Sequence, residues 1–521
     1  MNKNMERGYK ILKKVKLDYI AKRTILYLII ISSVSLLIRL FYFPFDIPLT
    51  HDAVGYFWYA IDTKVLEHLA TDYGFPNTGW PMLLSLFFGI MDSNNFIDYM
   101  TIQRLVTIVI SVLTIIPVYF LCKKFFNNSL SLLGALLFAF EPNMIQNSIL
   151  GLTDILYIFL ITTSFLLVQS SNKKLVYFAF AIASLSAIVR YEGLVFLAVL
   201  TIIFFIKFRK EKQVVLKYIF AIGIFILILL PVMYLRIADN GEDGLISHIL
   251  AGVQVTSDIS SNQSEISPNL ATFLSNGFQS LLKYTGWVMI PYFVIFVPVG
   301  IILGIKTKKP ELFYIILSIM ILSIPAFYAY SREIQETRYL LVLMPFFSVL
   351  SLFMIDYIGN KTNRRKLFFI LLIIVIFTSS CVYIELRKVD LEHEREAFEI
   401  SQHVAEFTEV TNKYEPESKY LKVASIGNNF PITKNDSIPQ TITLHTNYFS
   451  MIDFIKSNKE NNITHIVTDD HNESKILKKL FLNDEKYPYL VKVYDSIEHG
   501  YKYHVKIYKI DYKKFIENLN E

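Results

Sequence analysis

The chain has 521 residues, of which 53% are hydrophobic and 18% are charged, and its formal net charge is +6. The charged fraction is below the roughly 25% of an average soluble domain, so the composition is typical of a multi-pass membrane protein. With 2 Cys and this apolar content, the composition excludes a disulfide scaffold and a disordered chain.

Apolar segments divide most of the chain, and a segment of about 20 residues is long enough to cross a bilayer. We predict a polytopic α-helical membrane protein in which residues 25–386 form the transmembrane domain. The predicted spans are eleven in number: 25–44, 102–121, 126–144, 149–169, 175–190, 193–207, 217–235, 285–305, 311–330, 338–357 and 367–385. A half-buried helix at 80–91 could precede the second span.

The Lys and Arg residues indicate the orientation of these spans. A basic tail covers residues 1–24, and every second connection is basic, for example near 123–124, 306–309 and 361–366. Cytoplasmic connections are enriched in Lys and Arg. We therefore expect a cell-membrane protein with a cytoplasmic N-terminus and an extracytoplasmic C-terminus. Since the basic surplus is explained by topology, we expect no nucleic-acid partner.

The external connections hold most of the polar residues near the spans. They include a first external loop at 45–101 and a large external loop at 236–284, which could be a lid or a flexible connection. The polar residues are His51, Asp52, Tyr56, Trp80, Glu141, Asp154, Arg190, Tyr191, Glu192, Arg332, Arg338 and Tyr339. Taken singly they have structural explanations, such as a helix N-cap, snorkelling or an aromatic belt. Together they predict a polar cleft that opens outward, because ionisable groups at membrane depth usually face a cavity.

Residues 387–521 are more polar, and their apolar stretches shrink to strand length. We predict strands at 420–426, 463–468, 490–495 and 502–509 and helices at 391–412, 447–458, 473–486 and 512–519. This alternation is typical of a small soluble α/β domain, which the topology places outside the cell. We interpret it as a packing or acceptor-handling module, because it contains no phosphate loop, metal-ligand cluster or nucleophile motif.

The chemistry of an outward cleft limits the reaction. Outside the cytoplasm there is no ready supply of nucleotide sugars, so a transferase needs a donor that arrives in the membrane, such as a polyprenyl-phosphate sugar. Arginines would bind its phosphate, and a carboxylate would take the proton of the acceptor hydroxyl. We predict an inverting glycosyltransferase acting on the extracytoplasmic face. The alternative is a transporter or flippase of lipid-linked substrates, which predicts internal repeats and helices broken near mid-membrane.

Several motifs resemble those of a known family. Residues 48–53 with Tyr56, then Gly79-Trp80-Pro81, Glu141-Pro142, Asp154, residues 190–193 and Arg338-Tyr339 occur in the order found in the GT-C glycosyltransferases. The branch is that of protein O-mannosyltransferases and lipid A aminoarabinose transferases, and the resemblance covers residues 25–385. It implies that Asp52 is the catalytic base and that Arg190 binds the donor phosphate. Many members have an Asp-Glu pair where this chain has His51-Asp52, so a second acid is absent or is supplied by Glu141 or Asp154.

The other residues follow from the same resemblance. Arg338 and Arg332 are the further candidates for phosphate binding, and Glu192, His51, Tyr56, Trp80, Tyr191 and Tyr339 are candidates for the pocket wall. The branch generally requires no metal, although Asp52, Glu141 and Asp154 could form a weak oxygen site for a divalent cation. The expected partners are a polyprenyl-phosphate sugar, the bilayer, and an acceptor that could be a protein, a glycan or a lipid.

Overall fold

The computed structural model describes residues 3–50, 52–71, 73, 76–93, 96–251, 270–307, 309–388, 392, 395–400, 422–424, 450–457, 463–470 and 475–520. The chain divides into two compact units. The first comprises residues 1–43, 56–91 and 102–388, and the second comprises 44–55, 92–101 and 389–521. The candidate site residue His51 lies outside the described residues.

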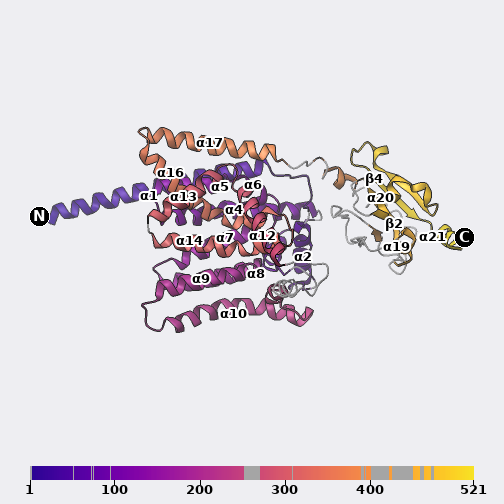
Figure 1. Ribbon diagram of the computed structural model, residues 1–521, viewed down its shortest axis with the longest axis horizontal. Helices are drawn as coiled ribbons and strands as arrows, with labels where there is room; N and C mark the ends of the chain where they lie inside the picture. Colours follow the sequence, from indigo (N-terminus) through magenta and orange to yellow (C-terminus); the bar gives the residue numbers. More distant parts are fainter. Residues whose placement is uncertain are drawn as a thin grey trace. The chain divides into compact units, whose positions relative to one another are not determined.

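The first unit is a bundle of helices that run roughly parallel to one another (Figure 1). Each of the eleven predicted spans coincides with one helix or with two consecutive helices. The helices are α1 (Lys3–Phe41), α4 (Phe96–Lys123), α5 (Asn128–Ala139), α6 (Pro142–Ser148), α7 (Asp154–Val168), α8 (Lys173–Val189), α9 (Gly193–Phe208), α10 (Val214–Asn240), α12 (Leu270–Val288), α13 (Phe293–Lys306), α14 (Pro310–Leu322), α15 (Ile324–Ser331), the 3₁₀ helix η1 (Thr337–Leu343), α16 (Met344–Lys361) and α17 (Arg365–Leu386).

Helix length separates these elements into two groups. Among the described residues, six helical segments are long and apolar enough to cross a membrane: Lys22–Phe41, Ile97–Lys123, Val214–Asn240, Pro310–Ser331, Thr337–Lys361 and Arg365–Leu386. The bent pair α12 and α13 would make a seventh. Helices α5, α7 and α9 have 12, 15 and 16 residues. At about 1.5 Å per residue they are shorter than the roughly 30 Å of a hydrocarbon core. The chain is thus a multi-pass membrane protein, and eleven crossings stay a prediction.

The predicted connections contain more helix than expected. The basic tail is helical from Lys3 onward and continuous with the first span. The first external loop contains α2 (Asp52–Leu66) and α3 (Gly79–Ile90), and α3 confirms the half-buried helix predicted at 80–91.

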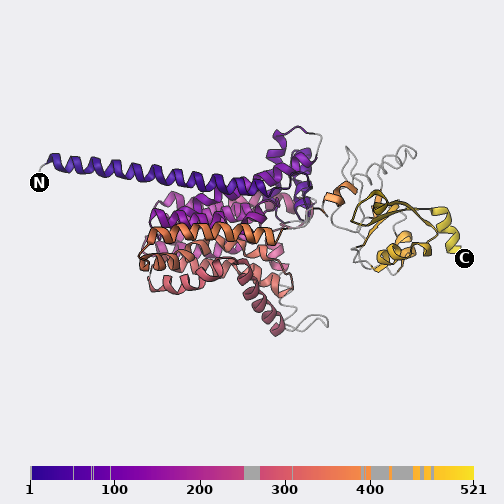
Figure 2. The same cartoon turned by 90° about the horizontal axis from the view of Figure 1, so that it is seen from above.

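The ends of the predicted loop at 236–284 are helical as well, because α10 extends to Asn240 and α12 begins at Leu270. Helix α12 meets α13 at 108° and slants away from the other helices (Figure 2). Its buried residues Phe273, Gly277, Tyr284 and Val288 recur at helical spacing.

The second unit contains a four-stranded sheet in the order β1-β2-β4-β3. The strands are β1 (Lys422–Ala424), β2 (Ile463–Asp469), β3 (Leu490–Asp495) and β4 (Val505–Ile510). β1 is parallel to β2, and the other pairs are antiparallel. The helices are α19 (Met451–Ser457), α20 (Lys475–Leu482) and α21 (Tyr512–Asn520), and residues 395–400 are also helical. Within the described residues the predicted strands and the last three predicted helices are confirmed, while residues 401–412 of the predicted first helix lie outside the described residues.

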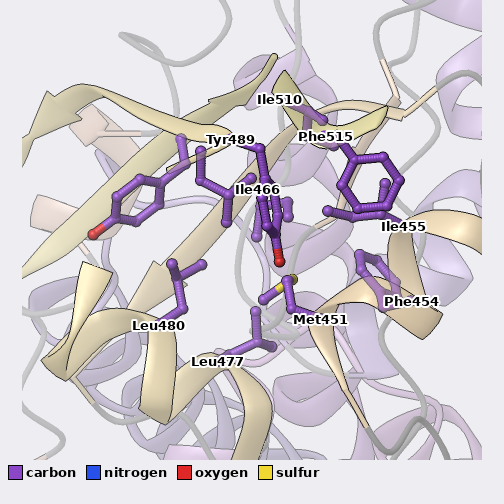
Figure 3. Packing of buried hydrophobic residues seen from close by; sticks show 11 residues of the cluster. Met451, Phe454, Ile455, Ile466, Leu477, Leu480, Tyr489, Ile510 and Phe515 are labelled. Carbon is purple, nitrogen blue, oxygen red and sulfur yellow. The ribbon is translucent and has the colours of Figure 1, made fainter. Parts of the chain in front are cut away.

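Helices cover both faces of this sheet. On one face, Met451, Phe454, Leu477 and Leu480 pack with Ile466 and Phe515 (Figure 3). On the other face, Ala397 and Ile400 pack with Val467, Val505 and Ile507. Neighbouring residues of β2 point to opposite faces, as the pleat of a strand requires, so both faces of β2 are buried. The second unit is therefore a small α/β fold, as the sequence predicts, with a hydrophobic core on each face of its sheet.

Candidate active site in the membrane unit

A tight connection between α8 and α9 carries the central charged residues. Arg190 has extended backbone (φ −147°, ψ 125°) and its N–H donates to the Ser186 carbonyl at 2.9 Å. The Gly193 N–H donates back to the Arg190 carbonyl at 2.8 Å. A Cβ on Gly193 would lie 2.6 Å from the nitrogen of Ala187, so only glycine permits this approach of α9 to α8. The connection therefore holds Arg190, Tyr191 and Glu192 in one fixed conformation.

Arg190 is the centre of a buried ion cluster. Its Nη1 donates to Asp154 Oδ1, its Nη2 donates to Glu192 Oε1 at 2.7 Å, and its Nε donates to Glu192 Oε2 at 3.3 Å. All three residues are buried: Arg190 is 8% exposed, Asp154 is 3% exposed and Glu192 is 5% exposed. Two carboxylates face one guanidinium, so the cluster has a net charge of −1 and three of the guanidinium donors are occupied. Such pairing is what makes a buried charge tolerable.

A narrow pocket, with a cavity volume of about 20 Å³, opens beside this cluster. Its lining comes from α7, the α8–α9 connection, α14, α15 and η1. The lining residues are Asp154, Tyr157, Ile158, Arg190, Glu192, Leu322, Pro325, Arg338, Tyr339 and Val342. Sequence analysis predicted five of these, namely Asp154, Arg190, Glu192, Arg338 and Tyr339, and did not single out Tyr157.

Two guanidinium groups flank one tyrosine ring in the pocket. The Arg190 and Arg338 Cζ atoms lie 5.7 Å and 6.0 Å from the centroid of Tyr339. Arg338 Nε also contacts Glu336 Oε2 at 2.5 Å, and these two side chains are 23% and 49% exposed. Arg338 is therefore the more accessible of the two arginines, and one of its partners is a solvated carboxylate. The pocket combines apolar walls with two guanidinium groups and the carboxylates of Asp154 and Glu192, and guanidinium groups are suited to bind a phosphate.

Asn77 joins the α8–α9 connection to the first predicted external loop. Its Oδ1 accepts from the Tyr191 N–H at 3.3 Å, and its Nδ2 donates to the Tyr56 hydroxyl at 2.9 Å. The Tyr191 ring also lies 5.0 Å from the ring of His248. Sequence analysis did not single out Asn77, although its place two residues before the Gly79-Trp80 motif was a usable signal. The two predicted residues Tyr56 and Tyr191 are thus connected through one amide.

Trp80 has a structural position and does not line the pocket. It is fully buried, and its Nε1 donates to the Gly151 carbonyl at 3.1 Å, to which Gln103 Nε2 also donates at 2.8 Å. A Cβ on Gly79 would lie 2.9 Å from the nitrogen of Val189. The Gly-Trp motif therefore fixes α3 against the end of α8 and against the turn that precedes α7. Trp80 is not among the lining residues of the Arg190 pocket, and both its ring and its N–H are used in packing.

Glu141 belongs to a different buried group. It is the N-cap of α6, where its Oε2 accepts from the Met144 N–H at 2.6 Å and its Oε1 accepts from Asn143 Nδ2 at 2.7 Å. The charge of Arg39 on α1 interacts with it. Sequence analysis overlooked Arg39, because a single arginine inside an apolar span changes its hydropathy little. Glu141 does not line the pocket of Arg190, and its role as a pocket residue or second acid stays a prediction.

Arg39 is fully buried with several partners. It donates to Ser111 Oγ at 3.0 and 3.2 Å, to the Ser35 carbonyl at 3.2 Å and to the Ala139 carbonyl at 3.1 Å. These contacts join α1, α4 and α5.

The remaining predicted residues are not among the lining residues of this pocket. Arg332 follows α15, is exposed, and places its Cζ 5.8 Å from the Tyr328 centroid. Asp52 is the first residue of α2, one turn before Tyr56, and is grouped with the second compact unit. Among the described residues, no three His, Cys, Asp or Glu side chains form a group that could hold a metal ion.

Comparisons with known proteins agree with this architecture. The family model described as dolichyl-phosphate-mannose-protein mannosyltransferase matches residues 76–235, a region that includes Asn77, Asp154 and Arg190. The search of curated proteins gives no match.

Solved membrane transferases have a similar structure. The oligosaccharyltransferase of Archaeoglobus fulgidus matches with a TM-score of 0.56 and 14% identity over 84% of this chain and 68% of its own. ArnT of Cupriavidus metallidurans matches with a TM-score of 0.57 and 10% identity over 92% of this chain and 97% of its own. The same ArnT bound to undecaprenyl phosphate gives 0.58 and 11% over the same shares. At these identities the likeness concerns the fold, and it confirms the predicted resemblance: the chain has the membrane fold of the GT-C glycosyltransferases.

Proposed function

We propose that this protein transfers a sugar from a polyprenyl-phosphate donor to an acceptor hydroxyl on the extracytoplasmic face of the membrane. The observation that carries the proposal is the pocket in which Arg190 and Arg338 flank Tyr339 inside a GT-C fold. Two proteins of similar fold have been solved with lipid phosphates, ArnT with undecaprenyl phosphate and the archaeal AglB with a dolichol-phosphate. A lipid-borne phosphate is accordingly the proposed donor group.

The two arginines have different proposed tasks. Arg190 already donates to Asp154 and Glu192, so it is held rigid and offers only its remaining N–H groups to the phosphate. Arg338 is more exposed, and its solvated partner is displaced at little cost. We assign the main phosphate contact to Arg338 and an orienting contact to Arg190. Fixed cations at this point stabilise the charge that develops on the leaving phosphate.

The proposed reaction is a direct displacement. The acceptor oxygen attacks the anomeric carbon, the bond from that carbon to the phosphate oxygen breaks, and the lipid phosphate leaves with the bonding electrons. Attack from the opposite face inverts the configuration. Asp52 is the proposed base for the hydroxyl proton. Asp52 is favoured for this role because it is the one acid in the segment that resembles the family's first external loop.

The topology and the metal requirement are part of the same proposal. We propose eleven crossings, a cytoplasmic N-terminus, and an external C-terminal domain that helps to handle the acceptor. Arg190 is already paired with two carboxylates, so Arg338 is the proposed main cation for a donor monophosphate, and we propose that no metal is needed. One related oligosaccharyltransferase structure carries an acceptor peptide. A protein acceptor is compatible with this chain, as are a glycan and a lipid.

One feature relates to the transporter alternative. A transporter would have helices broken near the middle of the membrane. The break between α12 and α13 falls at residues 289–292, near one end of the predicted span 285–305. Its position therefore gives no support to a central transport site.

The direct test uses the full chain reconstituted with a radiolabelled polyprenyl-phosphate hexose and membrane acceptors. We expect labelled acceptor with the wild type and a loss of roughly 10²- to 10⁴-fold in rate with Asp52→Asn, since a positioned general base contributes that much. The matched control is Asp92→Asn, an exposed acid of the same predicted loop. Normal turnover by Asp52→Asn would remove it as the base. Movement of donor across the bilayer without any transfer would favour the flippase.

A further inference from the structure

A second, larger cavity lies among α1, α5 and α17, apart from the proposed sugar-transfer pocket. It is a groove with a cavity volume of about 750 Å³. Its walls are mainly apolar and include Tyr27 and Ile30 of α1, Leu133 and Leu136 of α5, and Phe369 and Ile373 of α17. Ile30 and Ile373 are 48% and 41% exposed, so the groove opens on the outer surface of the bundle.

Helix packing explains why the groove exists. Helix α1 packs on α5 and α6, while α17 packs on α6 and α16. Both helices therefore close on α6, which follows the C-terminal end of α5. At the N-terminal end of α5 the wall is made by the first turns of α5 and α17. Apolar side chains that face outward between membrane helices are normally covered by lipid, so the groove is shaped to take a hydrocarbon chain.

The mouth of the groove is positively charged. Arg365 and Lys366, in the first turn of α17, line it, together with Asn127 and Ser129 at the start of α5. Two helix N-termini thus meet there, and each carries the positive end of a helix dipole. The contact of Arg365 with Asp356 is long, at 3.4 Å, and its side chains are 45% and 32% exposed. Such a pair is weak and leaves Arg365 able to bind an anion.

The dimensions match one leaflet of a bilayer. From Arg365 to Ile373 the groove follows α17 for eight residues, or about 12 Å at 1.5 Å per residue. This is less than half of the roughly 30 Å hydrocarbon thickness. A soluble anion would match only the charged mouth, whereas a phospholipid matches the mouth with its phosphate and the walls with its chain.

We propose that the groove among α1, α5 and α17 binds one anionic phospholipid, with its phosphate between Arg365 and Lys366 and its acyl chain along Ile30 and Phe369. The lipid comes from the leaflet on the side of the basic connections, which the sequence predicts to be cytoplasmic. This site is separate from the sugar-transfer pocket, because no lining residue is shared.

Native mass spectrometry of the full chain in detergent, titrated with phosphatidylglycerol and with phosphatidylcholine, tests the proposal. We expect one phosphatidylglycerol to stay bound and phosphatidylcholine to be lost. The double variant Arg365→Ala/Lys366→Ala should weaken phosphatidylglycerol binding at least tenfold. The matched control is Arg209→Ala/Lys210→Ala, which removes another exposed basic pair, predicted to lie on the same membrane side, that does not line the groove.

A second pair of variants tests the apolar wall without changing charge. Ile30→Trp should fill the groove and reduce phosphatidylglycerol binding, while Ile29→Trp, on a 56% exposed neighbour that does not line the groove, should not. Equal unfolding temperatures would show that both proteins are folded. Equal binding of the two lipids, unchanged binding in the Arg365/Lys366 double variant, or equal effects of the two Trp variants would each overturn the proposal. Binding of glycerol phosphate as tight as that of the lipid would overturn the role of the groove.

Discussion

Replacing Glu336 with Gln should tighten the binding of the donor. In the free protein the Glu336 carboxylate contacts Arg338 Nε at 2.5 Å, and a donor phosphate has to displace it. Because the two side chains are 49% and 23% exposed, this ion pair belongs to the solvated class that is worth about 0.2–1 kcal/mol. Removing the competing charge should therefore lower the donor KM by about 1.4- to 5-fold, since 1.4 kcal/mol corresponds to a factor of ten.

The assay is the initial rate of sugar transfer at varied donor concentration, with the acceptor held constant. The control is Glu333→Gln, which removes the same charge from an exposed position on the same connection. Arg338→Ala should shift KM in the opposite direction. The catalytic step should change little in Glu336→Gln, because the carboxylate has already left when the donor is bound. An unchanged or raised KM in Glu336→Gln relative to Glu333→Gln would refute the assignment of Arg338 to the donor phosphate.

Three further changes test other parts of the structure. Gly193→Ala should lower the unfolding temperature, because its Cβ would overlap the α8 backbone and overpacking costs about 1–3 kcal/mol. Arg39→Ala should lower the unfolding temperature of the membrane unit, because each hydrogen bond lost from this buried guanidinium to Ser111 and to the Ser35 and Ala139 carbonyls is worth about 1.5–3 kcal/mol. Burial lowers the pKa of His465 to about 4, so the free energy of unfolding of its domain should fall as pH decreases from about 6.5 to 4, by about 3 kcal/mol, as measured by hydrogen-exchange protection factors of β2 and β4.

Each of these predictions has its own control. Gly223→Ala, where a Cβ would meet no atom within 4 Å, should leave the unfolding temperature unchanged or slightly raised. Arg23→Ala, on the exposed start of the first span, should have little effect. His465→Gln should flatten the pH dependence of its domain, because the side chain no longer gains a proton on unfolding. If the His465→Gln domain lost stability on acidification as steeply as the wild type, another group would have to be responsible.

The span positions could be predicted because they depend on local composition. A stretch of apolar residues becomes a helix in a membrane whatever its partners are, since every backbone N–H and C=O must be bonded within the segment. The helix α12 was predicted only in its last residues, because polar residues such as Asn276, Gln279 and Lys283 lower its average hydropathy below that of a typical span. Hydropathy averaged over a window detects the uniformly apolar spans and misses a helix such as α12, in which apolar and polar residues are mixed.

The site could be predicted in its residue types but not in its pairings. Sequence analysis placed Asp154, Arg190 and Arg338 on one side of the membrane, and the structure lines one pocket with all three. It could not tell that Glu141 caps α6 or that Trp80 donates to a carbonyl, because these contacts depend on which helices become neighbours. A motif shows that a residue matters without showing whether it touches a substrate.

The pairing of Asp154 with Arg190 also affects how the chain enters the bilayer. A single charge costs at most about 2.5–3.5 kcal/mol in the translocon, the value that applies at the centre of an inserting helix. Asp154 begins α7 and Arg190 ends α8, so the two opposite charges lie at the same end of one antiparallel hairpin. Neutralisation needs only these two consecutive segments, and the partners are synthesised within 37 residues of each other. The hairpin can therefore leave the insertion machinery as a unit whose acid and base are already matched, before later helices arrive to build the pocket wall.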